Sequence, residues 1–167
     1  MADDAVIRNG NDAPFVEDEF GAGETDLYPG NLVGLNASGQ VEKHSSEGAT
    51  GTGLIVDLPF DPSYEKGEDA TGDGGVGERI RVAQVPVGGE VDARLAAGGD
   101  LTTAANANVT EGDILVETTT GALANHTDAE TGGEPEGAVY VALESVDNSG
   151  AAAGVTNQVP IEARRVA

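Results

Sequence analysis

The stretch that decides the fold occurs twice in this chain: residues 29–45 read PGNLVGLNASGQVEKHS and residues 111–127 read EGDILVETTTGALANHT. Identical residues recur at a constant offset of 82 positions (112 − 30), and many positions between them match in apolar or hydroxyl character. The identical pairs are Gly30 and Gly112, Gly39 and Gly121, and His44 and His126. In each copy a glycine then opens an apolar run, at Gly53 and Gly137. A repeated unit of strand, tight turn, strand and return strand predicts a barrel or sandwich built from two related halves.

Chance similarity between two unrelated β-hairpins is the alternative interpretation of this repeat, and the sequence leaves it open. Both interpretations give the same fold class. The chain contains 25 glycines among 167 residues, and its frequent turn signals leave little room for helix. Its apolar residues are mainly Val, Leu, Ile and Ala, with only 4% aromatic residues, and this composition suits strands. We therefore predict an all-β fold, a small β-barrel or sandwich with two related hairpin-rich halves.

The domain organisation follows from this repeat. Residues 27–167 should form a single β-barrel domain, with the internal repeat at about 29–58 and 111–146. Glycine and acidic residues dominate 61–78, which predicts a solvated loop insertion. A short helical turn is expected within 102–109. The expected strands lie near 31–35, 40–44 and 52–58, on both sides of a turn at 87–89, and at 158–166.

Residues 1–26 are predicted to form an extended N-terminal arm. Apolar residues alternate there with acidic and glycine-rich stretches, and two of the three phenylalanines of the chain lie in this segment. The arm is expected to dock on its own barrel, on a neighbouring subunit or on a larger partner; an ordinary first strand with a loose terminus is the alternative. The candidate residues for capsid or inter-subunit contact are Val6, Ile7, Phe15, Val16 and Phe20.

The charge balance is strongly acidic. Thirty acidic residues against eight basic ones give a formal net charge of −22. Such a surface repels itself in dilute buffer, whereas at 1 M salt the screening length falls to about 3 Å. We therefore expect a protein from a very salty environment. Binding to nucleic acid or to anionic membranes is not expected, because it requires clustered Lys and Arg.

Motifs for catalysis or for cofactor binding are scarce. Asp69–Gly74 is similar to the start of a calcium loop, but the twelfth position counted from Asp69 is Ile80 instead of Glu. His44 and His126 have no defined third ligand. The chain has no cysteine, no G-x-S-x-G elbow and no apolar run of about 18 residues that could span a membrane. We predict no catalytic residues, no cofactor and no metal site, and a soluble protein.

The order of several motifs along the chain resembles the capsid decoration proteins, or cement proteins, of tailed viruses, here one infecting a halophilic archaeon. The resemblance covers roughly residues 27–166. It implies a compact β-barrel on the outside of a head shell, commonly a homotrimer, that clamps neighbouring major capsid subunits. The extreme acidity and the long loop at 61–78 depart from the pattern, so no contact residue is carried over. The motifs are LYPGNLVGLNASGQVEKHS, GTGLIVDLPF, RIRVAQVPVGGEVDARLAAGGDLT, VTEGDILVETTTGAL and GAVYVALESVDNSG.

These observations together predict a structural virion protein and not an enzyme. Its expected partners are the major capsid protein and further copies of itself. It should be made in the host cytoplasm and lie on the outer surface of the capsid. The main alternative is a cell-surface or carbohydrate-binding β-module from a halophile, which would need an exposed aromatic platform from Tyr28, Tyr64 or Tyr140. A small barrel enzyme is the third possibility.

Overall fold

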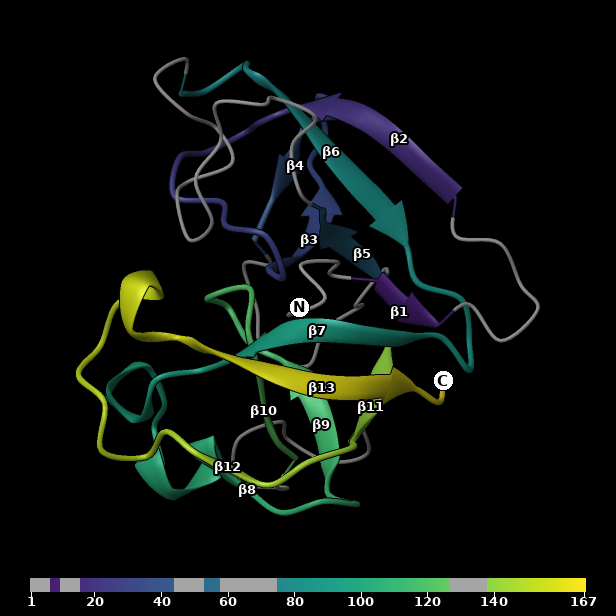
Figure 1. Ribbon diagram of the computed structural model, residues 1–167. Helices are drawn as coiled ribbons and strands as arrows, with labels where there is room; N and C mark the ends of the chain where they lie inside the picture. The colour runs from purple at the N-terminus through teal and green to yellow at the C-terminus, as the bar shows by residue number, and fades with distance from the viewer. Residues whose placement is uncertain (1–6, 10–15, 44–52, 58–74, 127–137) are drawn as a thin grey trace, which may run out of the picture.

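The computed structural model of the chain is all-β, which confirms the predicted fold class. Strands make up 42% of the structure, and no helix in the described part of the chain reaches seven residues. The structure describes residues 7–9, 16–43, 53–57, 75–126 and 138–167. Its strands form two groups, one above the other in Figure 1: a curled sheet and a closed five-stranded barrel.

The curled sheet, which we call the first unit, has the strand order β2-β6-β5-β3-β4. All of its neighbouring strands are antiparallel. A single parallel bridge between Ala22, just after β2, and Val41 of β4 draws its two edges together. The strands are β2 (Val16–Gly21), β3 (Leu32–Leu35), β4 (Val41–Glu42), β5 (Leu54–Val56) and β6 (Arg79–Gln84).

The barrel, which we call the second unit, has the strand order β7-β10-β9-β11-β13 and closes because β13 pairs with β7 over six residue pairs. Its strands are β7 (Glu90–Leu95), β9 (Ile114–Glu117), β10 (Leu123–Asn125), β11 (Val139–Ala142) and β13 (Val159–Arg165). Strand β1 (Ile7–Asn9) pairs antiparallel with β7, and β8 (Asn108–Val109) pairs antiparallel with β12 (Val146–Asp147). Three short 3₁₀ turns complete the fold: η2 (Gly98–Asp100), η3 (Ala104–Ala107) and η4 (Val155–Asn157).

The two units have the same strand connectivity and the same pairing register. Val33, Leu54 and Gln84 form a row across three strands of the first unit, and Leu115, Tyr140 and Arg165 form the equivalent row in the second. The row at the other end of the hairpins also recurs, with Leu35, Val41 and Ala22 matching Glu117, Leu123 and Leu95. The repeated unit therefore includes β2 and β6 as well as the hairpins, and it is longer than the sequence repeat indicates.

The turns inside the two copies have the same backbone geometry. The φ angles of Gly30 and Gly112 are 89° and 92°, and those of Gly39 and Gly121 are 74° and 71°. This left-handed region favours glycine, which explains why these residues recur. Asn31 Oδ1 accepts from Tyr28 N at 2.9 Å, just as Asp113 Oδ2 accepts from Thr110 N at 2.9 Å.

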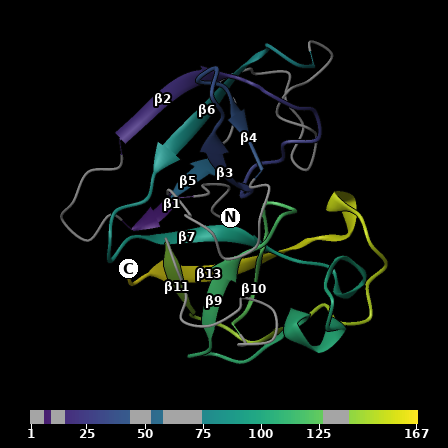
Figure 2. The same ribbon diagram turned by 180° about the vertical axis from the view of Figure 1, so that it is seen from behind.

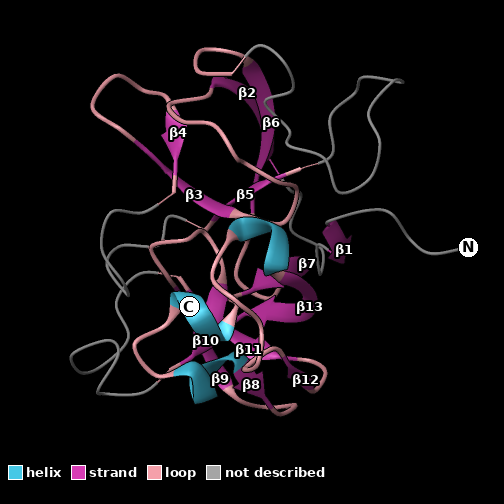
Figure 3. Cartoon of the chain, turned by 90° about the vertical axis from the view of Figure 1, so that its left-hand side faces the viewer, coloured by secondary structure: helices cyan, strands magenta, loops and turns pink. Residues whose placement is uncertain are grey.

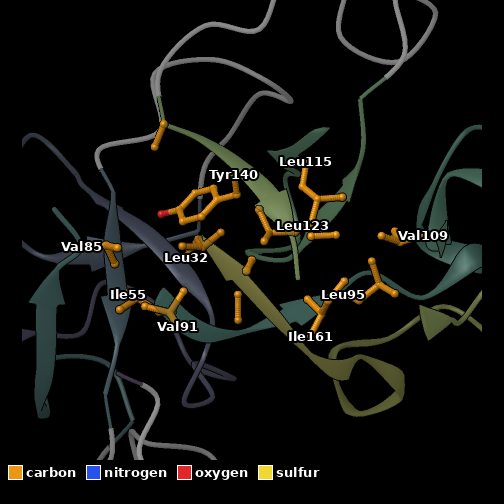
Figure 4. Packing of buried hydrophobic residues seen from close by; sticks show 14 of the residues in the cluster. Leu32, Ile55, Val85, Val91, Leu95, Val109, Leu115, Leu123, Tyr140 and Ile161 are labelled. Atoms are coloured by element: carbon orange, nitrogen blue, oxygen red, sulfur yellow. The ribbon is translucent and has the colours of Figure 1, made fainter. Parts of the chain in front are cut away.

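The largest core cluster joins the two units. Strand β7 alternates, with Val91, Ala93 and Leu95 pointing into the barrel. Leu32, Ile55 and Val85 of the first unit belong to the same cluster, so the outer face of the curled sheet packs against the barrel. Figure 4 shows the ring of Tyr140 among these residues, pointing toward Leu32 and Val85. Val33, Val56 and Val82 line the interior of the first unit in a separate cluster.

Most of the expected elements are present. The turn at 36–39 is closed by Gly39 N donating to Asn36 O at 2.9 Å, and η3 lies within the expected helical turn at 102–109. The strands expected near 31–35, 40–44, 52–58 and 158–166 correspond to β3, β4, β5 and β13. Of the loop expected at 61–78, residues 61–74 lie outside the described residues. Residues 16–21 of the expected arm form β2, an ordinary strand of the chain's own sheet.

Candidate interaction surfaces

The residues predicted to contact the capsid lie in the N-terminal segment, which pairs with both units. Val6 and Phe15 lie outside the described residues, and Ile7 and Val16 are described only as backbone, in β1 and β2. Phe20 is half-buried and packs against the core of the first unit. The described parts of the segment thus dock within the chain. A contact with a neighbouring subunit or with the shell stays a prediction.

Strand β2 is an edge of the curled sheet, but its sequence does not favour a further strand. It reads VEDEFG, with three consecutive acidic residues. Charged residues on an edge strand are a common device against pairing with other chains. Glu19 is exposed and lies 3.6 Å from Arg79 Nε of β6. We infer that this edge is protected and is not an open template for a partner strand.

Several described basic side chains lie close to carboxylates of the same chain. Arg81 Nε lies 3.6 Å from Asp57 Oδ2, and Lys43 Nζ lies 3.9 Å from Glu24 Oε2. Arg164 Nε donates to Glu90 Oε1 at 3.0 Å on the exposed side of the barrel. These pairs are distributed over both units. Within the described ranges, the basic residues therefore do not gather into a patch.

Three segments on one side of the second unit contain no charged residues. Residues 101–110, 118–124 and 148–158 contain no Asp, Glu, Lys or Arg. They comprise 28 residues, and at the chain's average of 23% charged residues they would carry about six charges (28 × 0.23). We call the surface that these segments form the uncharged side. Its exposed residues include Thr102, Thr103, Ala104, Ala105, Ala152 and Ala153.

Contacts between each pair of these segments bring them together. Asn148 N donates to Ala107 O at 2.9 Å, and Gln158 Nε2 donates to Thr120 O at 3.1 Å. Leu101 packs against a small cluster of buried alanines that includes Ala122. In Figure 3 the three short helical turns face the viewer on this side of the barrel, and in Figure 1 they lie on the left, away from the C-terminus.

The backbone of the uncharged side is held in place by close packing. A Cβ atom added to Gly98 would lie 2.0 Å from Ser149 O, and one added to Gly99 would lie 2.4 Å from Ala153 N. Gly98 N donates to Asn148 O, and Gly99 N donates to Ala151 O, both at 3.0 Å. The backbone of the loop before η4 thus packs directly against η2, and only a residue without a Cβ atom allows the two backbones to come so close.

Buried polar groups fix the same loop from within. The side chain of Asn148 is buried, and its Nδ2 donates to Ala96 O and Asn157 O, each at 3.0 Å. Asp100, which borders the uncharged side, accepts from Gly154 N at 3.0 Å. At the other border, Asp147 accepts from Ser149 Oγ at 2.6 Å, and hydrogen bonds from Ser149 lower the pKa of its carboxyl. Two of the four carboxylates that flank these segments, Asp100 and Asp147, are therefore engaged by the chain's own donors.

A second polar network joins the two units. Asn31 is fully buried, and its Nδ2 donates to Gln158 Oε1 at 3.0 Å and to Gly121 O at 3.2 Å. Arg94 of β7 donates from Nε to Pro29 O at 3.0 Å and lies 5.0 Å from the centroid of the Tyr28 ring. Figure 2 shows the barrel below the curled sheet from behind, with β7 on the side of the barrel that faces the curled sheet. These bonds fix the first repeat against the turn of the second.

The described residues contain no cluster of potential metal ligands. No group of three or more His, Cys, Asp or Glu side chains converges within the described ranges. Burial and the negative charge of Glu117 raise the pKa of Tyr140 above its ordinary value, while Arg165 lowers it, so this phenol stays neutral. His44 lies outside the described residues, and the backbone N of His126 donates to Ile114 O at 2.8 Å. Among the residues that the structure describes, no helix has the length and apolar character needed to cross a membrane.

Comparison with known proteins adds no relative. No family model matches this sequence, and no curated protein matches it. The resemblance to decoration proteins therefore depends on the order of motifs alone. The uncharged side was not recognised from the sequence, although the run AAAGVTNQ within 148–158 gave a signal; its three segments come together only in the fold.

Proposed function

We propose that this chain is a structural virion protein that binds the outer surface of an icosahedral head shell and stabilises contacts between major capsid subunits. The tailed virus concerned would infect a halophilic archaeon. The observation that supports this proposal best is a firmly packed, uncharged surface on a molecule with a net charge of −22. Such a surface suits contact with another protein, and the order of motifs resembles that of decoration proteins.

The physical basis of such a role is mass action. A protein that binds only the assembled shell stabilises it by about 2.7 kcal/mol per site when its free concentration is one hundred times Kd. Many equivalent sites on a shell add their contributions. In concentrated salt, exposed ion pairs are largely screened, so apolar and main-chain contacts would dominate the interface.

The described tyrosines do not support the carbohydrate-binding alternative. Tyr140 is fully buried in the core. Tyr28 is half-buried beneath Arg94, and Tyr64 lies outside the described residues. Neither described tyrosine offers an exposed ring on which a sugar could stack. We accordingly favour a binding partner that is a protein, and a role without catalysis.

Mass spectrometry of purified virus particles from the source of this sequence tests the proposal. We expect this chain at a near-stoichiometric ratio to the major shell protein, and release of the chain when the shell is disassembled. Its absence from particles that contain the shell protein, or its presence only in host fractions, would refute the proposal. Sugar-dependent retention on host cell envelopes would instead favour the alternative.

The proposal that the protein comes from a very salty environment can be tested separately, by the dependence of its thermal stability on salt. The thermal midpoint of the isolated chain should rise from low salt to about 1 M KCl, because screening at about 3 Å removes most of the carboxylate repulsion. A Glu78→Gln/Glu111→Gln variant loses two exposed carboxylates and should show a smaller rise. A midpoint that is independent of salt would contradict the proposed habitat.

A further inference from the structure

We propose that Asn108 is a modification site, at which a glycan is linked covalently to the side-chain amide nitrogen. The chain contains three copies of the acceptor pattern Asn-x-Ser/Thr, beginning at Asn36, Asn108 and Asn125. A pattern this short also arises by chance, so the sequence does not choose among them. The structure does, because an asparagine that carries a bulky, hydrophilic group must be exposed in the folded chain. This inference does not depend on shell binding.

Two of the three asparagines use their side chains to hold turns of the fold. Asn36 Oδ1 accepts from Gln40 N at 3.0 Å, and Asn36 Nδ2 donates to Glu42 Oε2 at 3.3 Å. Asn125 Nδ2 donates to Asp113 Oδ2 at 2.8 Å. Both side chains are half-buried. A sugar on either nitrogen would compete with the carboxylate for the space beside it, so we expect both to stay unmodified.

Asn108 presents its side chain to solvent. Its backbone is extended, with φ −99° and ψ 107°, and exposure alternates along the pattern: Asn108 is exposed, Val109 is buried and Thr110 is exposed. Successive side chains of a strand point to opposite faces, so the amide and the threonine hydroxyl share the exposed face. Among the described residues, none forms a hydrogen bond with the Asn108 side chain. Both groups that define the acceptor pattern are therefore open to a transferase.

The packing around this site is on its inner side. Val109 is 1% exposed and belongs to the largest core cluster. The backbone N of Asn108 donates to Ala105 O, and the residue pairs with Asp147 of β12. Because the strand is anchored from within, a group attached to the outward amide displaces none of these contacts. The pairing with Asp147 also puts the site at the border of the uncharged side.

The charge distribution gives such a glycan a physical role. Carboxylates hydrate much of this acidic chain, whereas residues 101–110 contain none. At about 1 M salt the screening length is about 3 Å, so the net charge of −22 no longer keeps other macromolecules away from this surface. A neutral glycan is bulky and solubilising, and its bulk is not screened by salt. It would therefore hydrate a border that the carboxylates leave bare.

The attachment is a substitution at C1 of the sugar. A bond forms between Asn108 Nδ2 and C1, the bond from C1 to a phosphate oxygen of the donor breaks, and one amide proton passes to a base of the transferase. The donor is thus a sugar activated by phosphate. Two sources supply this chemistry: a nucleotide-linked sugar in the cytoplasm and a lipid-linked sugar at a membrane.

Mass spectrometry of the chain purified from its natural source tests the inference. Cleavage after Asp and Glu places the three asparagines in separate peptides, residues 27–42, 101–111 and 118–128. We expect the added mass of a glycan on peptide 101–111, located at Asn108 by fragmentation, and no added mass on the other two. This measurement needs no variant and does not depend on whether a variant folds.

Three results would overturn the inference. They are an unmodified peptide 101–111, a sugar located on Thr102 or Thr103 of that peptide, and a glycan on Asn36 or Asn125 in place of Asn108.

Variants made in the natural source show whether the pattern itself is recognised. Thr110→Ala removes the hydroxyl and should abolish the added mass, whereas Thr110→Ser should retain it. Asn36→Gln is the matched control and should leave the modification unchanged. A glycan on Asn108 that survives Thr110→Ala would contradict recognition of the pattern. Incubating unmodified recombinant chain with membranes or with soluble extract and nucleotide sugars identifies the donor: transfer by membranes indicates a lipid-linked sugar, and transfer by soluble extract a nucleotide-linked one.

Discussion

The two units have the same connectivity and register, yet their equivalent outer faces have opposite environments. In the first unit, Leu32 is fully buried against the barrel, whereas Ile114, at the equivalent position of the second unit, is 40% exposed. Ala83 of β6 is likewise buried, and its equivalent on β13, Arg164, is exposed. The hairpins are encoded locally, whereas the burial of an outer face depends on how the two units pack against each other. Matched substitutions at equivalent positions can test this comparison.

The largest difference is expected between Leu32→Ala and Ile114→Ala. Removing a fully buried Leu side chain from the joint core should lower the free energy of unfolding by about 2–5 kcal/mol. Ile114 is partly solvated already, so its truncation should cost about 1 kcal/mol or less. Urea unfolding monitored by circular dichroism measures both. Equal losses would show that the outer faces of the two units are buried to the same extent in solution.

The two turn glycines provide the next comparison. Gly39 has no atom within 4 Å of an added Cβ, so Gly39→Ala should cost only the strain of a left-handed residue, about 1–2 kcal/mol. At Gly121 an added Cβ would also lie 3.0 Å from Leu32 O and 2.7 Å from Lys43 Cγ. Overpacking there should bring the loss for Gly121→Ala to about 2–4 kcal/mol. If thermal unfolding gave the same midpoint for both variants, the packing of this turn against the first unit would be contradicted.

Asn31 and Asp113 cap equivalent turns and differ in their second contact. Asn31→Asp would keep the acceptor for Tyr28 N and place a carboxylate oxygen near Gly121 O and Gln158 Oε1. We expect a loss of about 1–3 kcal/mol at neutral pH, because a buried donor becomes an acceptor. Asp113→Asn, at a half-exposed position, should cost less than about 1 kcal/mol.

The pH dependence of the Asn31→Asp variant has a definite sign. Burial beside carbonyl oxygens should raise the folded-state pKa of the new carboxyl above its unfolded value. The protonated form can donate to Gly121 O, so the loss should be smaller below the unfolded pKa and should grow as pH rises through the folded pKa. Unfolding measured from mildly acidic to neutral pH checks this, with the wild-type chain as the reference. A loss independent of pH would contradict the buried network.

The sequence predicts the hairpins because their signals are local. Gly39 and Gly121 occupy left-handed positions that few other residues tolerate, so their spacing carries the turn geometry. The closing strands are different: β2 reads VEDEFG and its equivalent β7 reads EVDARL, and this weak likeness did not reveal that they are equivalent. Leu32 and Ile114 are both large and apolar, so their opposite environments depend on packing between units. The uncharged side likewise depends on segments that only the fold brings together.

The smallest effect is expected at the core position where the two units differ by an aromatic ring. Leu54 of the first unit has Tyr140 as its equivalent, and the Tyr140 hydroxyl has no hydrogen-bond partner among the described residues. Burying an unpaired hydroxyl costs free energy, so Tyr140→Phe should leave the free energy of unfolding unchanged or raise it by less than about 1 kcal/mol. Tyr140→Leu, which matches the first unit, is the control for ring volume and should be destabilising. A clear loss of stability in Tyr140→Phe would instead reveal a hydrogen bond from this hydroxyl and a polar junction between the units.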